Sequence, residues 1–178
     1  TSLNIIRIGT SGSLQKDIPI DSFLMSTYAL DINGMLRSYP TQNISHPEVE
    51  DAFVNHTQWD EKKCYPLVIS NNKLLESKIT SDIIYKGMTA TAGGFYGPQG
   101  RTLRIAVKDP YLNSKIETFD YKGIKVTNLE METSAIYGLA KLLGHRACSM
   151  NAIIANRTLG IFSKNPDQVI GNLILYTL

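Results

Sequence analysis

The chain contains few of the residues that build covalent or metal cross-links. Its 178 residues include two cysteines, three histidines and one tryptophan. Two cysteines make no disulfide framework, so we expect Cys64 and Cys148 to be free, buried thiols in a reducing compartment. The histidines lack metal-ligand spacing, and the sequence has no HExxH, paired CxxC or GxSxG motif. We therefore predict neither a metal site nor a hydrolase nucleophile elbow.

Long apolar segments and an excess of one charge are also missing. No segment approaches the roughly 20 apolar residues of a membrane span, and no basic-then-apolar leader opens the chain, so we expect a cytoplasmic protein that does not bind membranes. The net charge is +2, and no basic arm is present, which argues against nucleic acid as a partner. A hydrophobic content of 43% with 19% charged residues is typical of a folded globular protein.

Apolar and β-branched segments alternate with helical patterns. Strands are predicted at residues 3–8, 22–31, 83–91, 124–127 and 147–155. Helices are predicted at about 70–79, 130–143 and 166–178, with a short one near 48–55 in an irregular excursion at 32–66. This alternation is typical of an α/β fold with a mixed, mostly covered sheet.

The length predicts one domain over residues 1–178. The first strand, at 3–8, has the composition of a buried core strand, and the last residues, 173–178, are apolar without a helix stop signal. We therefore expect the domain to be N-terminally incomplete.

The helix at 130–143 has the clearest pattern. Its apolar residues recur at the spacing of one core-facing stripe, formed by Ala135, Ile136, Leu139, Leu142 and Leu143. Thr127 and Glu130 are expected to form a capping box at its start. Gly144 is expected to end it.

The first segment suited to a ligand is Arg-Ile-Gly-Thr-Ser-Gly at 7–12. It predicts a strand running into a tight turn, where backbone N–H groups and the hydroxyls of Thr10 and Ser11, before Gly12, can hold an oxyanion. Arg7 supplies a planar cation that matches phosphate. An ion-paired arginine beside a glycine turn is the alternative interpretation.

The second segment follows the strand at 83–91, where open α/β sheets bind ligands. Phe95 offers a ring face for stacking a base. Gln99 carries a donor and an acceptor on one amide, which can match the imide edge of uracil, and Arg101 can donate to a ring carbonyl. A glycine-rich loop with a packed aromatic side chain would explain the same residues without a ligand.

Two further segments contain carboxylates and a third arginine. In Glu-Met-Glu at 130–132, one carboxylate can bind ribose hydroxyls while Met131 packs on the sugar face. Carboxylates are, however, favoured in a first helical turn in any protein. Arg157, in Asn-Arg-Thr, follows the strand at 147–155 and can reach a base carbonyl directly or through water.

These four segments, in this order, resemble the nucleoside phosphorylase family, and the uridine phosphorylases most closely. The resemblance implies a three-layer α/β/α fold with a central mixed sheet. It implies a pentosyltransferase of nucleoside salvage, which cleaves uridine with inorganic phosphate as co-substrate and needs no cofactor. It also implies a homo-oligomer, a dimer or a trimer of dimers, whose other partners are a small-molecule nucleoside and phosphate.

The resemblance places phosphate at the first segment, ribose at the third, and the base at the second and fourth. The site residues that follow are Arg7, Thr10, Ser11, Gly12, Phe95, Gln99, Arg101, Glu130, Met131, Glu132 and Arg157. Among these, Arg7, Arg101 and Glu132 are expected to be catalytic.

The chain also departs from the family pattern. Purine-selective relatives have an aspartate near the position of Asn156 and Arg157, and its absence here favours a pyrimidine. Family members have an upstream portion with a glycine loop, more phosphate-binding arginines and a histidine that reaches a neighbouring subunit, which this sequence lacks. Three alternatives stay open: a purine-type phosphorylase, a nucleosidase that uses water, and a non-catalytic nucleoside-binding relative.

Overall fold

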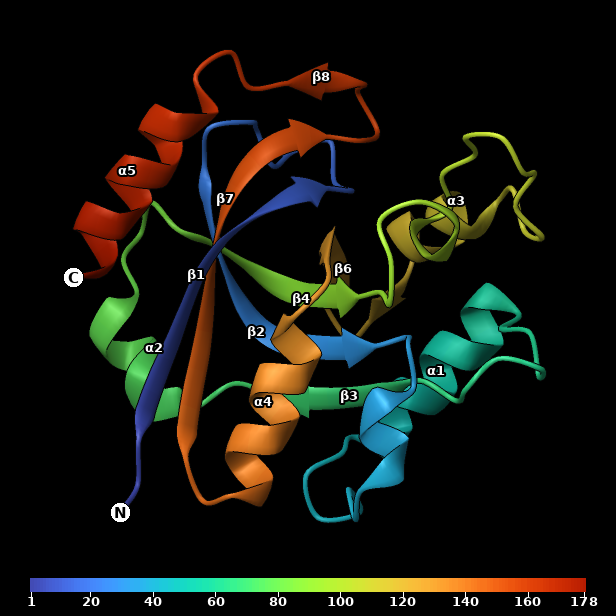
Figure 1. Cartoon of the computed structure of the whole chain (residues 1–178), viewed down its shortest axis with the longest axis horizontal. Coiled ribbons are helices and arrows are strands. Elements are labelled where there is room, and N and C mark those ends of the chain that lie inside the picture. The colour runs from blue at the N-terminus through green and yellow to red at the C-terminus, as the bar shows by residue number, and fades with distance from the viewer.

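The computed structural model describes all 178 residues (Figure 1). The strands are β1 (Asn4–Ser13), β2 (Phe23–Asp31), β3 (Leu67–Ser70), β4 (Tyr85–Thr91), β5 (Asp120–Tyr121), β6 (Ile124–Glu130), β7 (Arg146–Asn156) and β8 (Ile161–Phe162). The helices are α1 (Pro47–Thr57), α2 (Lys73–Ile79), α3 (Leu112–Glu117), α4 (Thr133–Leu142), α5 (Pro166–Thr177) and the short 3-10 helices η1 (Met35–Ser38) and η2 (Gly97–Gln99). None of the helices combines the length and apolarity needed to cross a bilayer.

The strands form one mixed sheet in the order β3-β2-β4-β6-β1-β7-β8, with β5 paired to β6. The pairs β1–β7, β2–β4 and β4–β6 are parallel, whereas β1–β6 and β2–β3 are antiparallel. Strand β2 also pairs with β7, so β2, β4, β6, β1 and β7 close into a ring of five strands. The predicted α/β fold with a central mixed sheet is confirmed.

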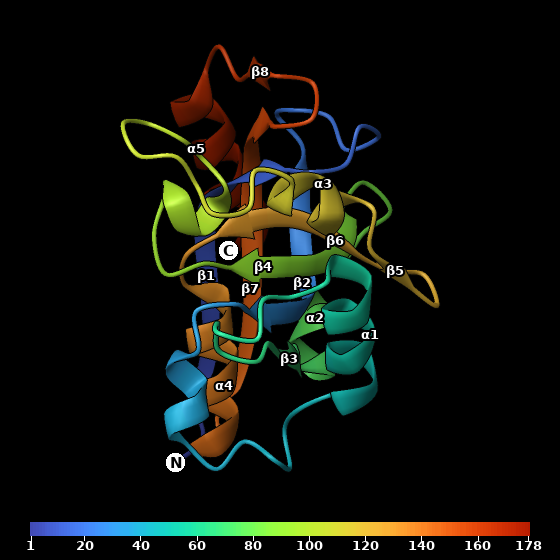
Figure 2. The same ribbon diagram turned by 90° about the vertical axis from the view of Figure 1, so that its right-hand side faces the viewer.

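Helices cover both faces of the sheet. Ala29 and Leu30 are successive residues of β2, so their side chains point to opposite faces. Ala29 packs in a core cluster with Tyr137 of α4, and Leu30 packs in another with Phe53 of α1 and Ile116 of α3. Figure 2 shows α1 and α4 on opposite sides of the strands. The layers are therefore helix, sheet and helix, as predicted.

Helix α4 begins at Thr133, later than its pattern predicts. The predicted capping box is wrong, because Thr127 and Glu130 both belong to β6. The Glu130 carboxylate still caps the helix, since its Oε2 accepts the backbone N–H groups of Glu132 and Thr133 at 2.8 Å each. Gly144 ends the helix as predicted, with a φ of 73°.

The core-facing stripe predicted for α4 is only partly correct. Leu143 is 68% exposed, and the other four stripe residues are half-buried. Two of them, Ile136 and Leu139, pack against the core cluster that contains Tyr137. The residues that face the sheet are Thr133, Ser134, Tyr137, Gly138 and Ala140. Two of the polar members are hydrogen-bonded through their side chains. Thr133 Oγ1 lies 3.0 Å from Ser149 Oγ. The Tyr137 hydroxyl donates to the Ser26 carbonyl at 2.6 Å and accepts the Ser149 N–H at 2.8 Å.

Two predictions of burial are corrected by the structure. Cys148 is a buried free thiol, but Cys64, in the loop before β3, is free and exposed. The segment 3–8 is only partly a core strand. Leu3 and Ile6 are exposed, whereas Ile5 and Ile8 are partly buried and pack against core clusters. Over residues 4–11, β1 pairs only with β7, so its other edge has no strand partner.

Candidate active site

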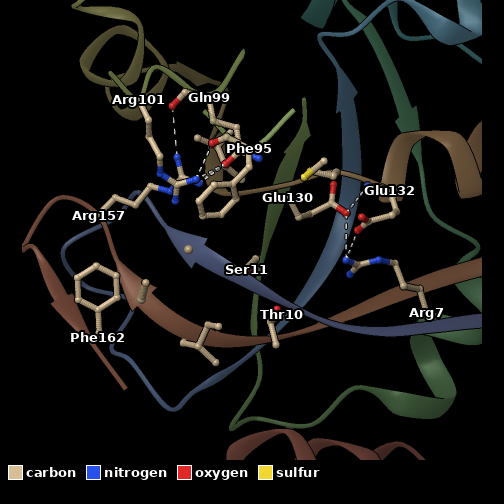
Figure 3. Close-up of a pocket in the computed structure, with 15 residues that line it drawn as sticks. Arg7, Thr10, Ser11, Phe95, Gln99, Arg101, Glu130, Glu132, Arg157 and Phe162 are labelled. Atoms are coloured by element: carbon tan, nitrogen blue, oxygen red, sulfur yellow. Dashed lines mark hydrogen bonds and ion pairs between the residues drawn. The ribbon is translucent and has the colours of Figure 1, made fainter. Parts of the chain in front are cut away.

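The four ligand-suited segments meet around one cavity of about 290 Å³. Strand β1 forms its floor, while the loop after β4, the β6–α4 junction and the end of β7 form its walls (Figure 3). All eleven predicted site residues line this cavity, together with Leu129, Ile154, Ala155 and Phe162. The structure therefore brings together predicted site residues that lie up to 150 positions apart in the sequence, from Arg7 to Arg157.

One end of the cavity is formed by Gln99 and two arginines. Gln99 is 2% exposed, and its Oε1 accepts hydrogen bonds from Arg101 Nη1 at 3.1 Å and from Arg157 Nη2. Because a guanidinium only donates, these contacts fix the amide orientation and leave Gln99 Nε2 as a further donor. The Arg101 guanidinium also lies 3.8 Å from the centre of the Phe95 ring. This end is therefore rich in donors and cationic, with an aromatic face beside it.

The two arginines at this end have no carboxylate partner. Burial, together with the nearby Arg101 charge, lowers the pKa of Arg157 to about 10. Burial also lowers the pKa of Arg101. The Arg157 Nε is buried without a hydrogen-bond partner. An anion or a polarised carbonyl placed here would relieve both the repulsion and the unmet donor.

At the other end of the cavity, Arg7 lies beside two carboxylates. Arg7 Nη2 lies 2.6 Å from Glu132 Oε2 and 3.3 Å from Glu130 Oε2. Its Nη1 donates to Asn151 Oδ1 at 3.0 Å and to Ser149 Oγ at 3.4 Å. Figure 3 shows this group separated from the Gln99 end, with Thr10 and Ser11 on β1 between them. The ion-paired arginine considered for this segment is thus present, and it faces the cavity.

The two glutamates at this end differ in exposure and in hydrogen bonding. The Glu130 side chain is 2% exposed and its carboxylate is fully engaged, since Oε1 also accepts from Thr91 Oγ1 at 2.6 Å. The Glu132 side chain is 54% exposed and makes its contact only to Arg7. Glu132 is therefore the carboxylate that a ligand can reach. No group of three or more His, Cys, Asp or Glu side chains is arranged to hold a metal ion.

Residues 7–12 lie within β1, so the predicted glycine turn is wrong. They are extended and pair with β7, with a register shift between Ser11 and Gly12. The glycines permit close packing instead. A Cβ on Gly9 would lie 2.6 Å from the Arg7 guanidinium, and one on Gly12 would lie 2.9 Å from Arg157 Nε. The side chains of Arg7 and Arg157 can therefore lie over β1 because Gly9 and Gly12 have no side chains there.

The apolar lining of the cavity was missed by reasoning from the sequence. Ile154 and Ala155 immediately precede Asn156 at the end of β7, and Leu129 precedes Glu130. A signal existed for these three, because neighbours of a strand-end site residue line the same pocket. Phe162, 73% exposed on β8, had no such signal because the short β8 has no recognisable strand pattern.

The sequence matches the family model described as "Phosphorylase superfamily" over residues 2–167. The chain belongs to the phosphorylase superfamily. Among curated relatives, a uridine phosphorylase of Thermococcus kodakarensis is 29% identical over 170 residues, 92% of this chain and 52% of the relative. A uridine phosphorylase of Haemophilus influenzae is 27% identical over 153 residues, 86% of this chain and 54% of the relative. The chain spans about half the length of these relatives.

Solved structures of phosphorylases share the fold. A nucleoside phosphorylase of Trypanosoma brucei, described as showing uridine phosphorylase activity, superposes with a TM-score of 0.82 at 23% identity. That match covers 98% of this chain and 63% of the other. A uridine phosphorylase structure from Phytophthora capsici superposes with a TM-score of 0.57 at 19% identity, covering 99% and 65%.

Proposed function

We propose that this phosphorylase-superfamily chain acts in the reversible phosphorolysis of uridine to uracil and ribose 1-phosphate. The observation that carries the proposal is the arrangement of a single cavity: a cationic donor cluster at one end, an accessible carboxylate at the other, and hydroxyls between them. The uridine phosphorylases among its relatives support the choice of substrate.

Uracil fits the end formed by Gln99, Arg101 and Arg157. Gln99 Nε2 and the two guanidinium groups would donate to the ring carbonyls, while Phe95 would stack beside the nucleoside. These donors favour a base that carries negative charge. They would therefore bind the departing uracil anion more strongly than the neutral base in uridine, which is the condition for lowering the barrier.

Ribose and phosphate fit the other end. Glu132 is the accessible carboxylate for the ribose hydroxyls, with Met131 against the sugar, while Glu130 holds the start of α4. Phosphate would bind near Arg7, Thr10 and Ser11 by replacing the Glu132 carboxylate on the Arg7 guanidinium. That exchange would free Glu132 for the sugar, so the two substrates would assist each other's binding.

The reaction follows from these positions. Cleavage of the glycosidic bond leaves positive charge on the ribosyl carbon and negative charge on the base. Arg101, with Gln99, stabilises the base, while a phosphate oxygen held beside Arg7 forms the new bond to the sugar carbon. Positioning and preorganised electrostatics account for catalysis, with no covalent enzyme intermediate.

We also propose the wider setting that the family resemblance implies. Residues 1–178 would act as one nucleoside phosphorylase-like domain. The protein would use inorganic phosphate as co-substrate without a cofactor, assemble as a dimer or trimer of dimers, and serve nucleoside salvage. A reducing cytoplasmic compartment would suit the exposed free thiol of Cys64.

The test is uracil release from uridine by the full-length protein, measured while phosphate is varied from zero to saturation. A rate that rises from zero to a plateau with phosphate supports phosphorolysis. A rate independent of phosphate would indicate the nucleosidase alternative. Faster cleavage of inosine than of uridine would indicate a purine-type enzyme. Uridine binding in a calorimeter without any turnover would indicate the non-catalytic relative.

A further inference from the structure

Each of the five ring strands contributes one buried polar side chain to a continuous hydrogen-bonded chain. We name these side chains the polar belt: Ser11 of β1, Ser26 of β2, Thr89 of β4, Asn128 of β6 and Asn151 of β7, all at most 7% exposed. Asn151 Nδ2 lies 3.0 Å from Ser26 Oγ, which lies 2.5 Å from Thr89 Oγ1. Thr89 Oγ1 lies 2.8 Å from Asn128 Oδ1, and Asn128 Nδ2 lies 2.9 Å from Ser11 Oγ. The belt therefore follows the strand order of the ring.

Arg7 at one end of the polar belt and the Asn128 amide near the other end determine the direction of its hydrogen bonds. Arg7 Nη1 donates to Asn151 Oδ1 at 3.0 Å, and because a guanidinium cannot accept, the Asn151 amide must donate to Ser26. Thr89 has one hydroxyl hydrogen, and it donates that hydrogen to Asn128 Oδ1. Ser26 must therefore donate to Thr89, and all the bonds run in one sense away from the Arg7 cation.

The polar belt ends at Ser11 with a free donor. Ser11 Oγ accepts from the Asn128 amide, so its own hydrogen is not used within the belt. Ser11 lines the cavity between Arg7 and the Gln99 end. Hydrogen bonds aligned in one sense polarise one another, which makes the last hydroxyl a stronger donor. Arg7 and the Ser11 hydroxyl, the two ends of the belt, thus both face the cavity.

We propose that the polar belt positions the phosphate co-substrate. It holds the Arg7 guanidinium in place and leaves the Ser11 hydroxyl to donate a hydrogen bond to a phosphate oxygen. Ser26, Thr89, Asn128 and Asn151 are positioning residues, since they reach phosphate only through Arg7 or Ser11. The inference rests on the proposed function, because it assigns phosphate to this end of the cavity.

The test removes one hydroxyl from the middle of the polar belt, away from the cavity. Thr89→Val keeps the side-chain volume but breaks the belt, whereas Thr89→Ser loses a methyl group but keeps it. We expect Thr89→Val to raise the KM for phosphate at least fivefold, with the KM for uridine changed less than twofold. Thr89→Ser should restore the phosphate KM to within twofold of the wild type. Both variants are expected to unfold at a lower temperature.

Thr57→Val is the matched control. Thr57 is a buried threonine of α1 whose hydroxyl donates to the Phe53 carbonyl at 2.7 Å, and it does not line the cavity. Its removal should lower the melting temperature and leave both KM values within twofold. If Thr89→Val leaves the phosphate KM unchanged, or Thr89→Ser raises it equally, the belt only packs the sheet and the inference is wrong.

Two further measurements sharpen the result. If the polar belt acts through the Ser11 hydroxyl, Thr89→Val should raise the phosphate KM less in a Ser11→Ala background than in the wild type. If Thr89→Val raises the phosphate KM by the same factor in both backgrounds, the polar belt does not act through Ser11.

If the wild type has no turnover, the proposed function fails. The polar belt is then tested by the rise in melting temperature that phosphate induces. A rise that Thr89→Val reduces supports the belt, and a rise that it leaves unchanged overturns it.

Discussion

Replacing Arg101 with alanine tests the claim that catalysis depends on charge developing on the base. Arg101 donates to Gln99 Oε1 at 3.1 Å and to the Phe95 carbonyl at 2.8 Å, and its charge lies in the donor cluster with Arg157. Loss of one preorganised donor to a developing anion costs about 2.7–4 kcal/mol, or roughly 10²–10³ in kcat. Because Arg157 and Gln99 remain, we expect the lower figure, a decrease in kcat of about 100-fold.

The assay is steady-state uridine cleavage at saturating phosphate, with kcat and the KM for uridine determined separately. The KM should change less than about fivefold, because uridine in the ground state does not yet carry the charge that Arg101 stabilises. Arg104→Ala is the matched control, since Arg104 is an exposed arginine of the same loop that does not line the cavity. A variant of Arg101 with unchanged kcat and a raised KM would refute the reasoning.

Three further predictions follow from particular contacts. Gly9→Ala places a Cβ 2.6 Å from the Arg7 guanidinium, so the KM for phosphate should rise about tenfold or more. Gly171 has open space around it, so the control Gly171→Ala should leave the KM for phosphate unchanged. Gln99→Ala should reduce the preference for uridine over other nucleosides, and an unchanged preference in competition assays would refute the base assignment. Burial raises the pKa of Cys148 to about 11, so its thiol stays protonated at pH 8: a thiol reagent should titrate one cysteine in the native protein and two after denaturation, and two in the native state would contradict its burial.

The residues that follow strands were predictable from the sequence. Gln99 and Arg157 come after the apolar segments that form β4 and β7, and the edge of an α/β sheet gathers such positions into one place. The strands β2 and β7 could be located because they are largely buried and have continuous apolar stretches. The shorter β3 and β8 lack enough residues to show a pattern.

The details within the site were not predictable because tertiary contacts override local preference. Glu130 looked like part of a helical capping box, but β6 continues through it by pairing with β4. Gly9 and Gly12 have the pattern of turn residues in the sequence. In the structure, each leaves space for an arginine side chain that lies over β1. Helix α4 buries Thr133 and Tyr137 toward the sheet because their hydroxyls have polar partners there, and no periodicity of apolar residues reveals such partners.

The most direct test of the account is to follow phosphorus while uridine is cleaved. We would incubate the full-length protein with uridine and inorganic phosphate and record ³¹P NMR spectra alongside uracil formation. The account predicts a new sugar phosphate signal that grows in equal amount to uracil as inorganic phosphate declines. Uracil without a new phosphorus signal would mean that water, and not phosphate, attacks the sugar, and would contradict the phosphate site assigned to Arg7, Thr10 and Ser11.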